Sequence, residues 1–223
     1  MLLSEYIQQI SNLVRDDSDL INDSDLIFAL NQAVVRYSSD RPLFKIEDVS
    51  SVAGGLTLPT PAGWLAGFSK IKQIEYPVGS NPTETLASHS IYQSPTGEEI
   101  RLCVSLAIGA IVRLTYSQMH QITESIDTIF INHQAALIHY AAAECCEQLA
   151  SFAAGNSDST INADSVDHNN GSERWTKRAN DLRLRYFNNL GIDLKRNAAV
   201  GVVVDMDLTD SRGRDRFFHK GRN

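Results

Sequence analysis

The chain has 223 residues, 43% of them hydrophobic, with a formal net charge of −7 and three cysteines, so a sizeable core can form. The apolar run 135–143 is interrupted by His139 and is too short for a bilayer, and residues 1–5 lack the basic region of a signal peptide. Because an odd cysteine number with two adjacent residues is a poor disulfide framework, we expect reduced thiols in a soluble protein of a reducing cell interior.

Two helices are predicted at the start of the chain. Apolar residues recur at spacings of three and four from Leu3 to Val14, with Ser4 as the N-cap. A second helix begins near Ser24, with Asp25 in its first turn, and ends at Arg41-Pro42, because the residue before proline avoids helical backbone. The apolar stripe of this second helix is predicted to consist of Ile27, Leu30, Ala33, Val34 and Tyr37.

The hydrophobic period changes to that of strands between residues 43 and 117. Short β-type runs at 44–49, 56–58, 71–76, 90–92, 100–104 and 110–116 alternate with turn residues. Apolar and polar residues alternate over 112–116, which predicts one buried and one solvated face. We expect a small antiparallel sheet or barrel of about five or six strands, with Trp64 and Phe68 covering one open end.

Helix returns from about Asn132 to Ala154, with Gly155 as its stop, and this helix is apolar nearly all round, which is typical of a buried central helix. The polar stretch 155–171 is predicted to be a mobile loop. A fourth helix is expected from Ser172 to Leu190, ending at Gly191. Its apolar stripe is Trp175, Ala179, Leu182, Tyr186 and Leu190, and its other faces carry Arg174, Lys177, Arg178 and Arg185.

The end of the chain differs in charge from the rest. Residues 1–170 contain 8 Lys and Arg against 20 Asp and Glu, and residues 171–223 contain 12 against 7, which gives −12 and +5. After Gly191 no helical period remains, and a single β-type run contains Val202, Val203 and Val204. Such a segment is expected to extend as an arm and to pair with a neighbouring subunit or with the edge strand of a partner.

These elements predict an α+β fold: a four-helix bundle with an inserted small antiparallel β module and an extended C-terminal arm. The predicted parts are a helical hairpin at 1–42, the β module at 43–117, the helices that complete the bundle at 118–191 and the arm at 192–223.

Motifs for catalysis are missing from the sequence. It has no Gly-rich phosphate loop, no Gly-x-Ser-x-Gly elbow and no His-Glu-x-x-His pair, so we expect no enzyme and no cofactor. His139 and Cys146 are seven residues apart beside Cys145, but no second Cys/His pair has metal spacing, and cysteine in an alanine-rich helix is typically a small core residue. We therefore expect no metal site.

The basic tail is the main candidate for binding. Phe217-Phe218 lies inside a basic run, and an aromatic pair rimmed by arginines favours docking to a protein, with solvated disorder and nucleic-acid contact as alternatives. The predicted docking residues are Arg212, Arg214, Arg216, Phe217, Phe218 and Lys220.

The pattern resembles the head–tail adaptor (connector or neck) proteins of tailed bacteriophages. The likeness is carried by residues 25–42 (DLIFALNQAVVRYSSDRP), by 141–144 with 149–150 in the central helix, and by 175–179 continuing through Tyr186 to Leu190-Gly191. The inserted β module is larger than in the smallest, all-helical adaptors.

The resemblance implies a structural virion protein of the neck, assembled in the host cytoplasm. Such proteins form a ring, usually of twelve copies, beneath the portal protein, dock to it through the C-terminal arm, and meet a downstream neck or tail protein. DNA would pass through the ring without specific binding, and no membrane is involved. The alternatives are another neck or tail-completion protein, a nucleic-acid-associated module that uses the basic helix and tail, and an enzyme whose active site is assembled from distant residues.

Overall fold

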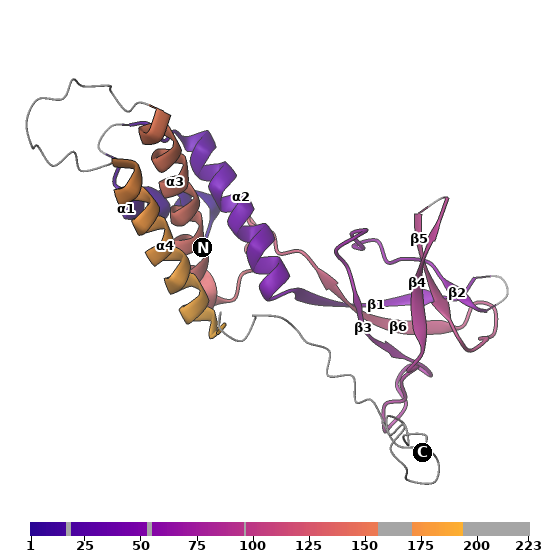
Figure 1. The fold of residues 1–223 in the computed structure, drawn as a ribbon. Coiled ribbons are helices and arrows are strands. Elements are labelled where there is room, and N and C mark those ends of the chain that lie inside the picture. Colours follow the sequence, from indigo (N-terminus) through magenta and orange to yellow (C-terminus); the bar gives the residue numbers. More distant parts are fainter. Residues whose placement is uncertain (17–18, 53–54, 96, 156–170, 194–223) are drawn as a thin grey trace, which may run out of the picture. The chain divides into compact units, whose positions relative to one another are not determined.

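The computed structural model describes residues 1–223 except 17–18, 53–54, 96, 156–170 and 194–223 (Figure 1). The chain divides into two units, residues 1–191 and 192–223. The predicted loop at 155–171 and the predicted arm therefore lie almost wholly outside the described residues, and the fold below is that of the first unit.

Three α-helices, α1 (Leu3–Val14), α2 (Asp23–Asp40) and α4 (Gly171–Leu190), pack around a central fourth, α3 (Gln134–Gly155) (Figure 1). A short 3-10 helix (Ile131–His133) precedes α3. Helix α3 contacts α1, α2 and α4. Its buried residues lie on all sides of the helix, as its sequence predicts, and the fully buried Ala141, Ala142 and Ala143 let neighbouring helices approach closely.

The start of α2 is fixed by a reciprocal cap. The Asn22 side chain accepts hydrogen bonds from the backbone N–H groups of Ser24 (2.9 Å) and Asp25 (3.2 Å), and the Asp25 carboxylate accepts one from the Asn22 backbone (3.0 Å). The predicted position of Asp25 in the first turn is thus confirmed. The predicted apolar stripe of α2 is wrong at Ile27, which is exposed, whereas the neighbouring Leu26 is buried.

The predicted N-cap of α1 is wrong. Ser4 lies inside the helix, and Leu2 occupies the N-cap position. The Leu2 backbone N–H donates instead to the Glu5 carboxylate at 2.7 Å, so an acidic side chain in the first turn supplies the missing acceptor.

Six strands form two antiparallel sheets, where one sheet or barrel was predicted. The first sheet has the order β1-β6-β3 and the second the order β2-β5-β4. Their bounds are β1 Leu43–Ser50, β2 Thr57–Leu58, β3 Ile71–Glu75, β4 His89–Ser94, β5 Gly97–Leu102 and β6 Ile111–Gln118. All six strands overlap predicted β-type runs, but β5 begins three residues before its predicted run of 100–104 and ends two residues earlier. Two sheets arise because β6 pairs with β1 and β3, whereas β5 pairs with β2 and with its hairpin neighbour β4.

A hydrophobic core unites residues from both sheets. Val112, Leu114 and Tyr116 of β6 are fully buried, which confirms the predicted alternation. Trp64 packs against this core, and its indole N–H donates to Glu98 at 2.7 Å. The other buried members of the core are Val49, Leu58, Ile74, Ile100, Leu102 and Leu106.

The predicted α+β class is confirmed, with four helices and two small antiparallel sheets. A four-helix bundle is not established, because α4 packs chiefly on α3 while α1, α2 and α3 all contact one another. None of the described helices combines the length and the apolar character that crossing a membrane requires.

Candidate interaction surface

The predicted docking residues Arg212, Arg214, Arg216, Phe217, Phe218 and Lys220, and the predicted arm strand at Val202–Val204, lie outside the described residues. The candidate site is therefore built from the groups of the first unit. The polar clusters described below contact groups inside the fold, and the exposed side chains are described after them.

The three groups weighed for metal binding do not come together. Cys145 and Cys146 are fully buried in α3, and burial raises their pKa values to about 12 and about 11. His139 lies beside α4, where its Nδ1 is 3.2 Å from the Asn189 side-chain amide. Among the described residues no three His, Cys, Asp or Glu side chains gather in a way that could hold a metal ion.

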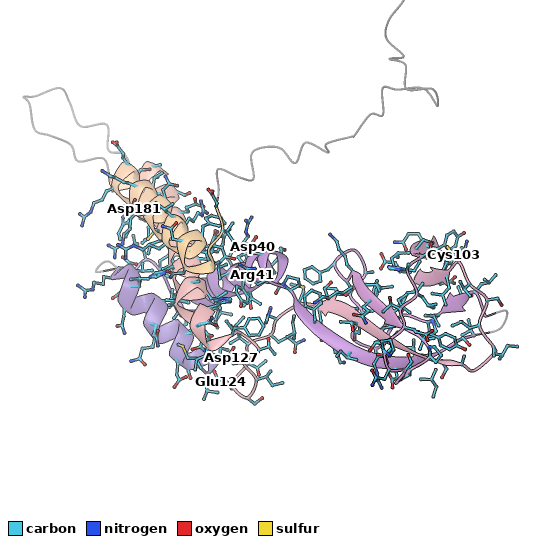
Figure 2. All side chains as sticks on the ribbon, turned by 90° about the horizontal axis from the view of Figure 1, so that it is seen from below. Asp40, Arg41, Cys103, Glu124, Asp127 and Asp181 are labelled. Atoms are coloured by element: carbon cyan, nitrogen blue, oxygen red, sulfur yellow. The ribbon has the colours of Figure 1, made fainter. Side chains whose placement is uncertain are left out.

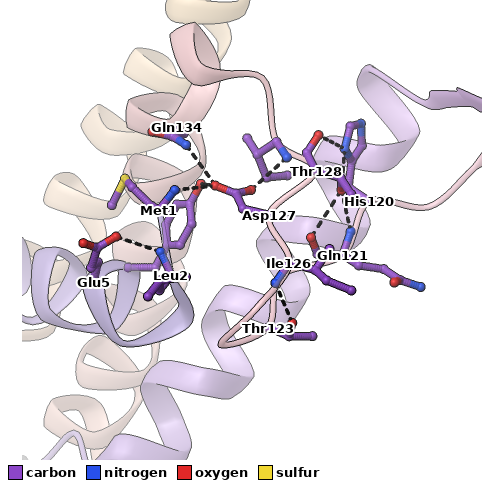
Figure 3. Close-up of polar contacts among 12 residues, drawn as sticks. Met1, Leu2, Glu5, His120, Gln121, Thr123, Ile126, Asp127, Thr128 and Gln134 are labelled. Carbon is purple, nitrogen blue, oxygen red and sulfur yellow. Dashed lines mark hydrogen bonds and ion pairs between the residues drawn. The ribbon is translucent and has the colours of Figure 1, made fainter.

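A buried carboxylate, Asp127, joins the start of the chain to the start of α3 (Figure 3). Its Oδ2 accepts hydrogen bonds from the Met1 amine (2.8 Å), the Tyr6 hydroxyl (3.1 Å) and the Gln134 side-chain amide (2.9 Å), and its Oδ1 accepts from the Ile129 backbone (2.8 Å). Burial, together with this carboxylate, raises the pKa of Tyr6. These contacts tie the chain start, Tyr6 of α1 and Gln134 of α3 to one carboxylate, which fixes the position of α1.

A buried histidine, His120, connects the end of α2 with the loop before α3 (Figure 3). Its Nδ1 lies 2.9 Å from the Thr128 carbonyl and its Nε2 lies 2.9 Å from the Arg41 carbonyl, while its backbone N–H donates to Ser38 at 2.9 Å. Burial lowers the pKa of His120. The sequence gives no signal for this contact, since its partners lie far away along the chain.

The cations of α4 are partly used inside the fold. Arg183 forms ion pairs with Glu144 (2.9 Å) and Glu147 of α3, and Arg178 donates to the Leu13 carbonyl at 2.5 Å. The Tyr186 hydroxyl donates to Asp40, at the end of α2, at 2.7 Å (Figure 2 labels Asp40). Of the four cations predicted on this helix, Arg174, Lys177 and Arg185 are exposed and Arg178 is half-buried.

Exposed apolar side chains gather on β1. Phe44 is 46% exposed and Ile46 is 63% exposed, on the face of the first sheet opposite the core. The Lys72 ammonium lies 4.3 Å from the centre of the Phe44 ring. The alternation of Phe44 and Ile46 with Lys45 and Glu47 is visible in the sequence, but which set faces solvent depends on the pairing with β6. This apolar surface is the candidate interaction surface of the first unit.

Matches to known proteins come from solved structures. No family model and no curated protein matches the chain. Among solved structures, a chain from the neck of an empty gene transfer agent (GTA) particle with C6 symmetry has a TM-score of 0.28 at 13% identity, covering 76% of this chain and 87% of that one. A chain from the virion of a native GTA particle has a TM-score of 0.30 at 12% identity, and one from its neck with C12 symmetry has 0.27 at 12%; each covers 78% of this chain and 91% of the other. TM-scores this low do not establish a shared fold.

Proposed function

We propose that this chain is a structural virion protein of the phage neck, a head–tail adaptor that forms a ring beneath the portal protein and extends the DNA channel toward the tail. The proposal rests on the sequence resemblance given above and on the way in which the chain uses its polar groups. It assigns no catalytic residue, metal or cofactor.

One observation carries the proposal. The clusters that an enzyme would place in a cleft are occupied by internal partners in the described residues: Asp127 holds four donors, His120 lies between two carbonyls, and Arg183 pairs with two glutamates. The chain then continues as a second unit, 192–223, whose sequence ends in a basic and aromatic run. A folded body followed by a separate binding segment is typical of assembly proteins.

In this proposal the second unit docks to the portal protein. Phe217 and Phe218 would fill an apolar pocket on the partner, and Arg212, Arg214, Arg216 and Lys220 would pair with an acidic rim. The ring, of about twelve copies as the resemblance implies, would present an acidic surface to DNA, because residues 1–170 carry a net charge of −12. Like charges repel, so DNA would slide through the channel without specific binding.

The nucleic-acid alternative is weaker for a physical reason. Affinity for DNA grows with the number of phosphates that cations neutralise. Helix α4 offers Arg174, Lys177 and Arg185 as exposed cations, whereas the charge of Arg183 is taken up by α3. Helix α4 alone therefore makes a short footprint, and this alternative depends on the basic tail.

The test is the mass of the purified chain, alone and with its cognate portal protein, by light scattering. We expect a many-copy complex with the portal, and we expect deletion of 205–223 or the double change Phe217→Ala/Phe218→Ala to abolish it while the far-UV spectrum stays unchanged. The matched control is Arg174→Ala/Lys177→Ala on α4, which should bind the portal as the parent does. Normal portal binding by the truncated chain would disprove arm docking, and salt-dependent retention on DNA would favour the nucleic-acid alternative.

A further inference from the structure

Strand β1 has one unpaired edge. All eight of its residues pair with β6, from Leu43 opposite Gln118 to Ser50 opposite Ile111, and β3 lies on the other side of β6. Within the described residues, no other strand pairs with β1, and its backbone makes no hydrogen bond outside that ladder before Ser50. Alternate residues of an antiparallel strand direct their N–H and C=O groups away from the partner, so this edge presents a row of unused donors and acceptors.

The opposite edge of the same sheet is protected. The Leu86 backbone N–H donates to the Ile74 carbonyl of β3 at 2.9 Å, and the Tyr76 N–H donates to the Glu84 carbonyl at 3.2 Å. The loop residue Ala62 donates to the Glu47 side chain, on the core face of β1, and leaves the edge itself uncovered. An eight-residue edge with exposed Phe44 and Ile46 is thus the open side of this sheet.

The chain itself carries a segment of matching pattern. Residues 200–204 read Val-Gly-Val-Val-Val. Val200, Val202 and Val204 recur with a period of two, so in a strand they share one face, as Phe44 and Ile46 do on β1. Directly opposed apolar side chains stabilise a strand pair. The charges also agree, since the Lys72 ammonium lies beside Phe44 while Asp205 and Asp207 follow the valines.

We propose that residues 200–204 of a second copy of this chain add to the free edge of β1 as a fourth strand, with Val202 and Val204 on the face of Phe44 and Ile46. Each copy has one such edge and one such segment, so the contact is heterologous, and in a closed ring every edge is paired. The inference rests on the proposed ring assembly and names the surface through which neighbouring copies meet, a contact separate from portal docking by residues 212–220.

The test is disulfide trapping between two differently tagged full-length chains, at high concentration and without the portal. Both carry Cys103→Ser, because Cys103 is exposed while the other two cysteines are fully buried. One chain carries Ile46→Cys and the other carries Val202→Cys, Val204→Cys or Val203→Cys. A disulfide needs Cβ atoms about 3.5–4.5 Å apart, so only same-face neighbours across the strand pair are joined.

We expect a reducible band at the summed mass of the two chains with Val202→Cys or Val204→Cys, whichever lies directly opposite Ile46, because the next residue on the same face is about 7–8 Å away. Val203→Cys, whose side chain would lie on the other face, should give background. The matched control places Tyr92→Cys on β4, an edge strand of the second sheet with a similarly exposed side chain, and should give background. Equal trapping at all three valines, trapping at Tyr92, or none at Ile46 overturns the proposal.

A chain carrying both Ile46→Cys and the valine substitution that gives the stronger band, at Val202 or Val204, separates the two sources of the strand. A disulfide confined to single chains would assign the strand to the same copy and overturn exchange between copies. The mass of the portal complex is measured in parallel. A ring on the portal with no disulfide from Ile46 to Val202 or Val204 overturns this inference alone, whereas the disulfide without portal binding overturns the adaptor role alone.

Discussion

Replacing Asp127 by asparagine should destabilise the fold more than its small change in size indicates. Three donors converge on Oδ2 and a fourth meets Oδ1. An asparagine must direct its NH₂ group at one of these two sites, so at least one donor faces another donor in either orientation. The side chain is 11% exposed, so water cannot restore the lost bonds fully.

The size of the effect follows from those contacts. A hydrogen bond to a charged group contributes about 1.5–3 kcal/mol, and leaving buried donors unpaired adds to the loss, so we expect a decrease of about 2–4 kcal/mol in the free energy of unfolding. That is a large share of the roughly 5–15 kcal/mol typical of a native domain. In denaturant unfolding the midpoint should fall while the slope stays constant.

The matched control is Glu124→Gln in the same loop, which removes the same charge. Its side chain is exposed and accepts a single bond, from Ser4 at 3.4 Å, so we expect a change below about 0.5 kcal/mol. Tyr6→Phe removes one of the donors, and in the Asp127→Asn background it should cost less than in the parent. Equal stability of the Asp127→Asn and Glu124→Gln chains would refute the reasoning.

Three further predictions concern single sites. Gly55→Ala should lower the free energy of unfolding by at least about 2 kcal/mol more than Gly67→Ala. Both glycines have positive φ, but only at Gly55 would an added Cβ lie 1.8 Å from a backbone carbonyl oxygen, that of Leu106. Equal melting temperatures of the two variants would contradict this. Arg183→Met should cost about 1–2 kcal/mol by leaving two partly buried glutamates unpaired, whereas the exposed Arg185→Met should change denaturant unfolding by less than about 0.5 kcal/mol. Burial lowers the pKa of His120, so the unfolded state binds a proton before the folded state does as pH falls through about 6.5. The free energy of unfolding should therefore decrease there by up to about 1.4 kcal/mol per pH unit. His120→Gln should show a shallower decrease between pH 7.5 and 5.5.

Local patterns predicted much of the fold. The central helix α3 is apolar all round and is buried by three neighbours, and α4 ends at Gly191, whose φ of 66° suits a residue without a Cβ. Each of these features depends on residues within one or two turns, which is the range over which sequence periodicity carries information.

Features that depend on distant partners were missed or wrong. Ser4 is a good capping residue by type, yet the helix begins at Leu3 with Leu2 at the N-cap position, and the Leu2 N–H donates to the Glu5 carboxylate. Ile27 fits the apolar stripe by spacing, but the packing of α2 selects Leu26. The roles of His120 and Asp127 could not be predicted, because their partners are brought together only when the chain is folded.

By itself the sequence determined the kinds of elements, their order and most of their bounds, because backbone preferences and hydrophobic periods are local. Tertiary structure alone decided the division into two sheets, the face of β1 that meets solvent, and the internal use of Arg183 and Asp127. The physical reason is register: β1 meets β6 across sixty or more intervening residues, and a shift of one residue would exchange the buried and exposed faces of the strand.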